Sequence, residues 1–192
     1  MAVELDRLMT VADYEAHLDS LLPDEPTPEL MNGGLVMAAR ASIRHARYLR
    51  DILEAINAWI REQAVPGEVF PEVEVVLDHF TVLVPDLAFV ALTNTQAVIE
   101  DECIVGPPDW VCEISSPRTR RFDAREKYPA YLRAGVREYW IADPARPAGE
   151  RFACFERVLT GSVGAMPLYQ PIAGGPAQSR IFPGIALPAK LL

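Results

Sequence analysis

The chain of 192 residues contains few cysteines and no long apolar run. Its three cysteines, Cys103, Cys112 and Cys154, are far apart and form no CxxC pair, which excludes a cysteine-based zinc site and is typical of a reducing cytoplasm. No apolar stretch approaches the roughly 20 residues of a membrane span. The N-terminal residues carry acids and lack the apolar core of a secretory signal. We therefore expect a cytoplasmic protein that does not enter the membrane.

Basic residues are also scarce. The sequence has 18 lysines and arginines but 27 acidic residues, which gives a net charge of -9. Proteins that hold nucleic acid tightly need cations to neutralise phosphates. Two segments are nonetheless locally basic, Arg40–Arg50 and Arg118–Lys127. The first is best explained as a solvated helix face. The second flanks the acids described below, so a phosphate-binding role for Arg120 and Arg121 is as well supported as simple solvation.

The length of 192 residues and the hydrophobic fraction of 50% predict one globular domain over residues 1–192. The order of its helices and strands indicates the mixed α/β (α+β) class. Helical spacing of apolar residues predicts helices over Val11–Leu22, Ser42–Glu62 and Asp123–Ala134. Alternating or continuous apolar runs predict strands over Leu35–Ala39, Val73–Asp78, Val82–Val84, Leu87–Leu92, Trp110–Ser115, Glu138–Ala142, Phe152–Val158 and Met166–Ile172. Pro129 removes a hydrogen bond inside the third helix, where we expect a kink.

A carboxylate stands inside the apolar strand Trp110–Ser115. Side chains of a strand alternate between its faces, so Glu113 shares a face with Val111 and Ser115. A charged carboxylate in such a place costs several kcal/mol unless a cation compensates it. The chain offers two candidate cations, a bound metal ion or Lys127 from the following helix.

A second acid, Asp86, lies between two apolar runs and directly follows Pro85. Proline cannot donate a ladder hydrogen bond, so Asp86 is expected at the mouth of a buried strand. Two acids followed by a lysine are the composition of a magnesium-dependent phosphodiesterase site. In such sites two carboxylates hold a hard cation, the metal activates water, and the lysine stabilises charge.

The order of these residues resembles the PD-(D/E)XK nuclease core and, more narrowly, the Uma-type family of bacterial proteins described as restriction endonucleases. The matching residues are Glu29-Leu30, Gly33, His45, Pro85 to Val90, Glu113 to Pro117, Thr119, Asp123, Lys127, Tyr131 and Ala134 to Pro144. The resemblance implies a restriction-endonuclease-like core with a mixed central sheet flanked by helices. It also implies a metal-dependent endonuclease that hydrolyses DNA.

The resemblance assigns roles to individual residues. Asp86, Glu113 and the Ile114 carbonyl would bind Mg²⁺ or Mn²⁺, and Lys127 would position water or stabilise the transition state. Two departures stand out. The lysine of the superfamily usually lies two residues after the second acid, where this chain has Ser115. The segment after Glu29-Leu30 usually contains a further acid, and here that position is Gly34. A catalytically weakened interaction or regulatory module is therefore the alternative function.

Two further residues have two explanations each, and a third has one. His45 shares a helix face with apolar residues, which favours a core histidine, whereas the resemblance implies a substrate-binding place at the edge of the site. Tyr131 lies one turn beyond Lys127 and either packs in the core or donates to a substrate oxygen. Asp123 and Lys127 are spaced i, i+4, which is typical of a helical ion pair.

The expected partners are DNA, bound weakly or with the help of another protein, and a second copy of the chain. Tyr139-Trp140 and the apolar C-terminal strands predict more hydrophobic surface than one small sheet covers. A two-fold homodimer is the commonest solution, and two sites would suit two DNA strands. A small-molecule hydrolase is disfavoured, because the sequence offers no nucleophile elbow.

Overall fold

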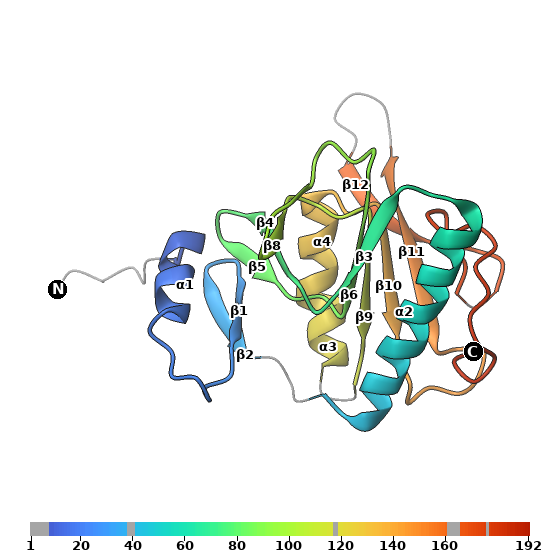
Figure 1. The fold of residues 1–192 in the computed structure, drawn as a ribbon, viewed down its shortest axis with the longest axis horizontal. Helices are drawn as coiled ribbons and strands as arrows, with labels where there is room; N and C mark the ends of the chain where they lie inside the picture. Colours follow the sequence, from blue (N-terminus) through green and yellow to red (C-terminus); the bar gives the residue numbers. More distant parts are fainter. Residues whose placement is uncertain (1–7, 38–40, 117–118, 161–165, 176) are drawn as a thin grey trace.

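The computed structural model describes residues 8–37, 41–116, 119–160, 166–175 and 177–192. Within this part of the chain, two six-stranded sheets combine with helices (Figure 1). The first sheet has the order β2 (Gly34–Met37), β1 (Pro28–Met31), β5 (Thr81–Leu83), β4 (Glu74–Asp78), β8 (Cys103–Val105) and β7 (Val98–Ile99). The second has the order β12 (Met166–Pro171), β11 (Phe152–Thr160), β10 (Glu138–Ala142), β9 (Trp110–Ile114), β6 (Leu87–Ala91) and β3 (Gly67–Pro71).

Both sheets are mixed, because β9 pairs with β10 and β4 with β8 in parallel, while the remaining pairs are antiparallel. The predicted mixed α/β class is confirmed. The sequence predicted one central sheet, and four strands were not predicted: β1, β3, β7 and β8. β7 and β8 have only two and three residues, too few to show a periodicity.

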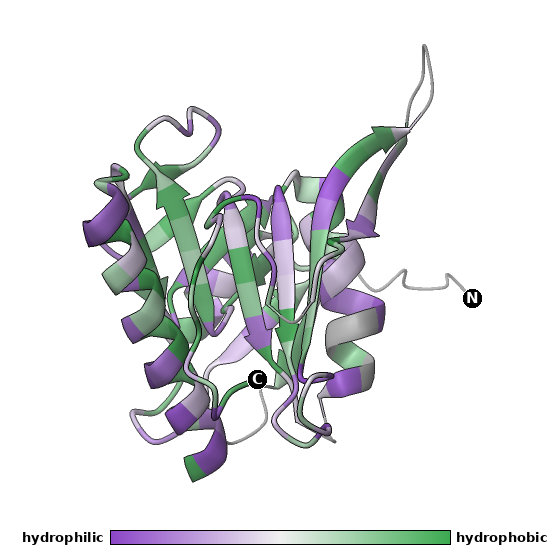
Figure 2. Ribbon diagram, turned by 90° about the vertical axis from the view of Figure 1, so that its right-hand side faces the viewer, coloured by the Kyte–Doolittle hydropathy of each residue, from purple (hydrophilic) through white to green (hydrophobic). Residues whose placement is uncertain are grey.

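Helices cover both faces of the second sheet. Helix α2 (Ile43–Gln63) packs on the face that carries Trp110, Cys112 and Ile114, and helix α4 (Tyr128–Ala134) packs on the face that carries Val111. The alternation predicted for this strand is therefore confirmed. Figure 2 shows apolar residues concentrated along the strands and polar residues on the outer sides of the helices.

Tyr139 and Trp140 are fully buried in these two cores. The argument that this pair leaves an uncovered surface for a second copy is therefore wrong, because α4 and α2 already cover it. The dimer itself stays a prediction. None of the helices in the described residues combines the length and apolar character that crossing a membrane needs.

The helix predicted from Ser42 is found almost unchanged as α2. The Ser42 side chain accepts a hydrogen bond from the backbone N–H of His45 and caps the helix. Helix α1 (Val11–Leu18) ends four residues before its predicted end at Leu22, whose side chain is 63% exposed. Because Leu22 does not pack in the core, the apolar face of the helix is not continued and the helix ends at Leu18.

The predicted helix Asp123–Ala134 is found as the last two of three short consecutive pieces. A turn of α-helix, α3 (Arg120–Phe122), leads into a π-helical segment, η1 (Asp123–Lys127), and then into α4. Pro129 lies in the first turn of α4, where its missing N–H leaves no hydrogen bond unmade. The irregularity expected at Pro129 thus lies one turn earlier. Such π segments often occur at functional sites, and this one ends at Lys127.

Candidate active site

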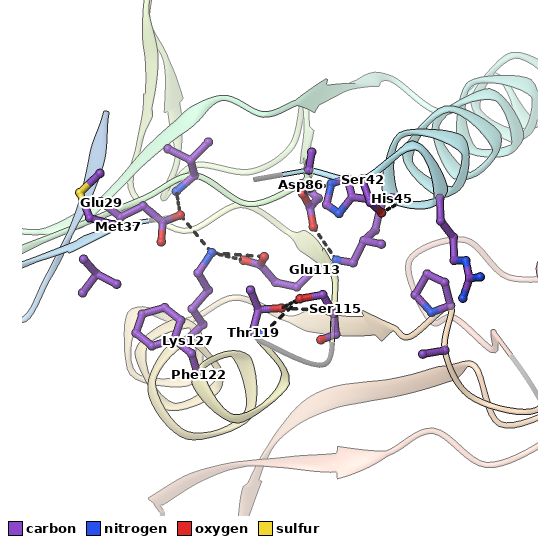
Figure 3. Close-up of a pocket in the computed structure, with 18 of the residues that line it drawn as sticks. Glu29, Met37, Ser42, His45, Asp86, Glu113, Ser115, Thr119, Phe122 and Lys127 are labelled. Carbon is purple, nitrogen blue, oxygen red and sulfur yellow. Dashed lines mark hydrogen bonds and ion pairs between the residues drawn. The ribbon is translucent and has the colours of Figure 1, made fainter. Parts of the chain in front are cut away.

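A cavity of about 820 Å³ opens where the β1–β2 hairpin, the start of α2 and the end of β9 meet. Its polar lining comprises Glu29, Ser42, Arg44, His45, Asp86, Glu113, Ser115, Ser116, Thr119 and Lys127. Apolar residues such as Val36, Met37, Ile43 and Phe122 complete the wall. The structure thus brings the predicted trio Asp86, Glu113 and Lys127 to one cavity (Figure 3).

Lys127 lies buried at the centre of the acids. Its Nζ is 3.0 Å from Glu29 Oε1, 3.1 Å from Glu113 Oε1 and 3.2 Å from Glu113 Oε2. Burial alone would lower the pKa of the ammonium, but the charges of Glu113 and Glu29 raise the pKa above its usual value. Lys127 is therefore a fixed cation at neutral pH. Lys127 is also one of the two candidate cations that the sequence offered to compensate the buried charge of Glu113.

Glu29 is the site residue that the sequence reading missed. It lies on the fully buried strand β1, and its Oε1 accepts hydrogen bonds from the Val84 N–H at 2.9 Å and from Lys127. The signal was present, since a glutamate in the short run Pro28–Met31 raises the same question as Glu113. Gly34 lies exposed on β2 of the same hairpin. The acid that this hairpin brings to the lysine is therefore Glu29, and position 34 supplies none.

Asp86 is held by two groups at the mouth of the cavity. Its Oδ2 accepts the backbone N–H of Ile114, and its Oδ1 lies 2.9 Å from Nε2 of His45. The hydrogen bond to Asp86 raises the pKa of His45 above its usual value, although partial burial acts against it. His45 therefore faces an acid of the site, and the alternative of a core histidine is not what the structure shows.

Oxygen and nitrogen donors for a metal gather around Asp86. Within the described residues, one ligand atom each from His45, Glu72 and Asp86 lie within 4.8 Å of one another. Asp86 also shares the cavity with Glu113 and Ile114, the other residues predicted to bind a metal. Carboxylate and carbonyl oxygens suit a hard divalent cation, so the donors present are compatible with Mg²⁺ or Mn²⁺.

The remaining substrate-binding candidates have other surroundings. Arg120 is 45% exposed and forms an ion pair with Asp143. The side chains of Arg121 and Asp123 lie outside the described part of the chain. Tyr131 is fully buried and its hydroxyl donates to Glu113 Oε1 at 2.8 Å, so its contact is with the acid itself. Among the candidates whose side chains the structure describes, His45 lines the cavity.

Comparisons with known proteins agree with this picture. The sequence model of the Uma2 family, described as "Putative restriction endonuclease", matches residues 11–190. The fold is similar to the crystal structure of a "putative nuclease belonging to DUF820" from Anabaena variabilis ATCC 29413. That similarity has a TM-score of 0.56 at 21% identity and covers 78% of this chain and 88% of the other. No curated protein matches the chain.

Proposed function

The chain belongs to the Uma2 family, and on this premise we propose that it is a metal-dependent endonuclease that hydrolyses phosphodiester bonds of DNA. One observation carries the proposal. Glu29, Asp86, Glu113 and Lys127 come from four separate segments and still line one cavity. A lysine and three carboxylates, two of them buried, are expensive to maintain for stability alone, because each buried charge must be compensated. Clusters of this kind are typical of functional sites.

Asp86, Glu113 and the backbone carbonyl of Ile114 are the residues that would hold Mg²⁺ or Mn²⁺. When bound, the ion supplies a nucleophile by lowering the pKa of water and offsets charge on the phosphate. Asp86 is positioned for this task by the Ile114 N–H, which fixes one carboxylate oxygen and leaves Oδ1 facing His45.

Lys127 provides positive charge and does not act as a base. Its pKa is raised, so it keeps its proton at neutral pH. A cation held in place before the reaction stabilises charge that develops on a phosphate in the transition state. Glu29 and Glu113 hold the ammonium from two sides. This arrangement fixes the ammonium beside the cavity. The lysine therefore need not occupy position 115, two residues after the second acid.

Tyr131 and Glu113 form the support of this cation. Glu113 Oε1 accepts hydrogen bonds from both the Tyr131 hydroxyl and Lys127. Burial raises the pKa of Tyr131 well above its usual value, and the nearby Glu113 charge adds to this effect. The hydroxyl therefore remains a donor, and Tyr131 acts as a positioning residue for Glu113.

The acidic net charge opposes binding to DNA, so the proposed DNA binding is weak and is aided by a partner or by a second copy. The net charge is -9, and exposed Arg44 is a cation of the cavity lining. Leu159 and Met166, at the end of the β11–β12 hairpin, are 64% and 74% exposed. These residues support the proposed homodimer. Light scattering at micromolar concentration tests it, and a monomer would remove the proposal.

A plasmid-nicking assay with Mg²⁺, Mn²⁺ or EDTA tests the nuclease. We expect cleavage that EDTA abolishes and that Glu113→Gln and Lys127→Met reduce at least about a hundredfold, as loss of a transition-state contact does. Glu126→Gln is the matched control, since Glu126 is exposed on the same helical segment. Folded wild type that cleaves nothing with either metal would favour the interaction module, for which the acidic charge is the supporting observation.

A further inference from the structure

We propose that His45 and Glu72 join Asp86 as ligands of the metal, and that the imidazole makes the site select Mn²⁺ over Mg²⁺. The inference rests on the proposed function only where it gives the ion a role in DNA hydrolysis. The ligands themselves can be tested by measuring metal binding alone. Neither His45 nor Glu72 belongs to the acid–acid–lysine pattern from which the site was predicted.

The separation of the donor atoms carries the first step. Nε2 of His45 and Oδ1 of Asp86 are 2.9 Å apart. Two ligands about 2.1 Å from an ion and at right angles to each other lie roughly 3.0 Å apart, and opposite ligands roughly 4.2 Å apart. The His45–Asp86 pair thus already has the spacing of neighbouring ligands. The third ligand atom, a carboxylate oxygen of Glu72, lies within 4.8 Å of both other ligand atoms.

The backbone fixes Glu72 beside Asp86. The N–H of Glu72 donates to the carbonyl oxygen of Asp86 at 3.2 Å, in the turn that follows β3. Glu72 has a φ of 49°, a left-handed conformation that is uncommon for glutamate. His45 is fixed from the other side, since its own N–H is held by the Ser42 cap at the start of α2. The turn after β3 and the start of α2 therefore present the two outer ligands to Asp86.

The chemistry of the donors gives the selectivity. Mg²⁺ prefers oxygen ligands and loses its waters reluctantly, whereas first-row transition metals accept imidazole nitrogen readily. A set of one nitrogen and two carboxylates consequently favours Mn²⁺. Removing a group that supports a ligand typically costs about tenfold to a hundredfold in metal affinity, and removing a ligand itself costs at least as much.

Binding of Mn²⁺ and of Mg²⁺ to the full chain at pH 8, measured by calorimetry, tests the selectivity. We expect wild type to bind Mn²⁺ at least about tenfold more tightly than Mg²⁺, and His45→Gln to lose most of that preference. Glu72→Gln should lower the affinity of the protein for both ions by about tenfold. His79→Gln and Glu68→Gln are the matched controls, because both side chains are exposed and lie outside the cluster, and neither should change either affinity.

Pulsed electron paramagnetic resonance of the Mn²⁺-loaded wild type provides a readout that needs no variant to fold. A nitrogen modulation from a directly bound imidazole is expected, and its absence overturns the inference. An unchanged Mn²⁺ preference in folded His45→Gln overturns it as well. If wild type binds Mn²⁺ through His45 but cuts no DNA, the proposed function fails and the ligand assignment holds. If wild type cuts DNA while His45→Gln keeps the Mn²⁺ preference, the nuclease holds and this inference fails.

Discussion

Replacing Lys127 by methionine removes a positive charge that contacts both Glu29 and Glu113. Methionine has a similar length, so the volume of the side chain is kept while the charge is lost. Both carboxylates are nearly inaccessible to water, at 4% exposure each. The variant therefore leaves two buried acids facing each other without their cation.

The size of the effect follows from this burial. Breaking a buried ion pair by removing one partner costs about 3–5 kcal/mol. In a chain of this length, one kcal/mol corresponds to about 2–4 °C in melting temperature. We expect Lys127→Met to melt roughly 6–20 °C below wild type in metal-free buffer. The triple variant Glu29→Gln, Glu113→Gln, Lys127→Met removes the charges together and should recover at least half of that loss.

Thermal unfolding followed by circular dichroism measures all three proteins. Arg125→Met is the control, because Arg125 is an exposed cation of the same π-helical segment and its loss should shift the melting temperature by less than about 2 °C. A Lys127→Met protein as stable as the control would refute the view that this ammonium compensates buried charge. A triple variant less stable than the single one would refute it too.

Three further predictions concern the metal, the hairpin and pH. A hundredfold excess of Mn²⁺ over Kd should stabilise wild type by about 2.7 kcal/mol and Glu113→Ala not at all, as scanning fluorimetry would show. Gly34→Glu should leave Mn²⁺ affinity unchanged in calorimetry, because position 34 is exposed on β2, whereas Glu29→Gln should alter the melting temperature. Burial raises the pKa of Glu138, so its contribution to stability is present at low pH and is lost as pH rises through that pKa. The stability of wild type relative to Glu138→Gln should thus fall between pH 4 and pH 7, and a constant difference would contradict this sign.

The Glu113–Lys127 contact could be predicted from the sequence because two local rules meet there. Strand alternation placed Glu113 on a covered face, and the cost of an unpaired charge then demanded a cation. The nearest lysine on the following helical segment was Lys127. Such reasoning needs only the strand and the segment that follows it.

The partner of Glu29 and the His45–Asp86 pair could not be found in this way. β1 is four residues long and belongs to a sheet whose existence the sequence did not indicate. The contact between His45 and Asp86 depends on where the start of α2 lies relative to β6, which is a property of the packed structure. Its spacing from apolar residues of the helix predicted that His45 lies in the core. In the structure His45 lies in the first turn of α2 and lines the cavity.

The contact between Lys127 and Glu29 joins segments 98 positions apart in the chain. Lys127 also links the two sheets, because Glu29 lies on β1 of the first sheet and Glu113 lies on β9 of the second. Long loops close late in folding, because their closure entropy must be overcome before the contact is gained. The cation of the cavity is therefore held in place only after both sheets have come together. A chain still emerging from synthesis, or one whose sheets have separated, carries the individual acids without an assembled site.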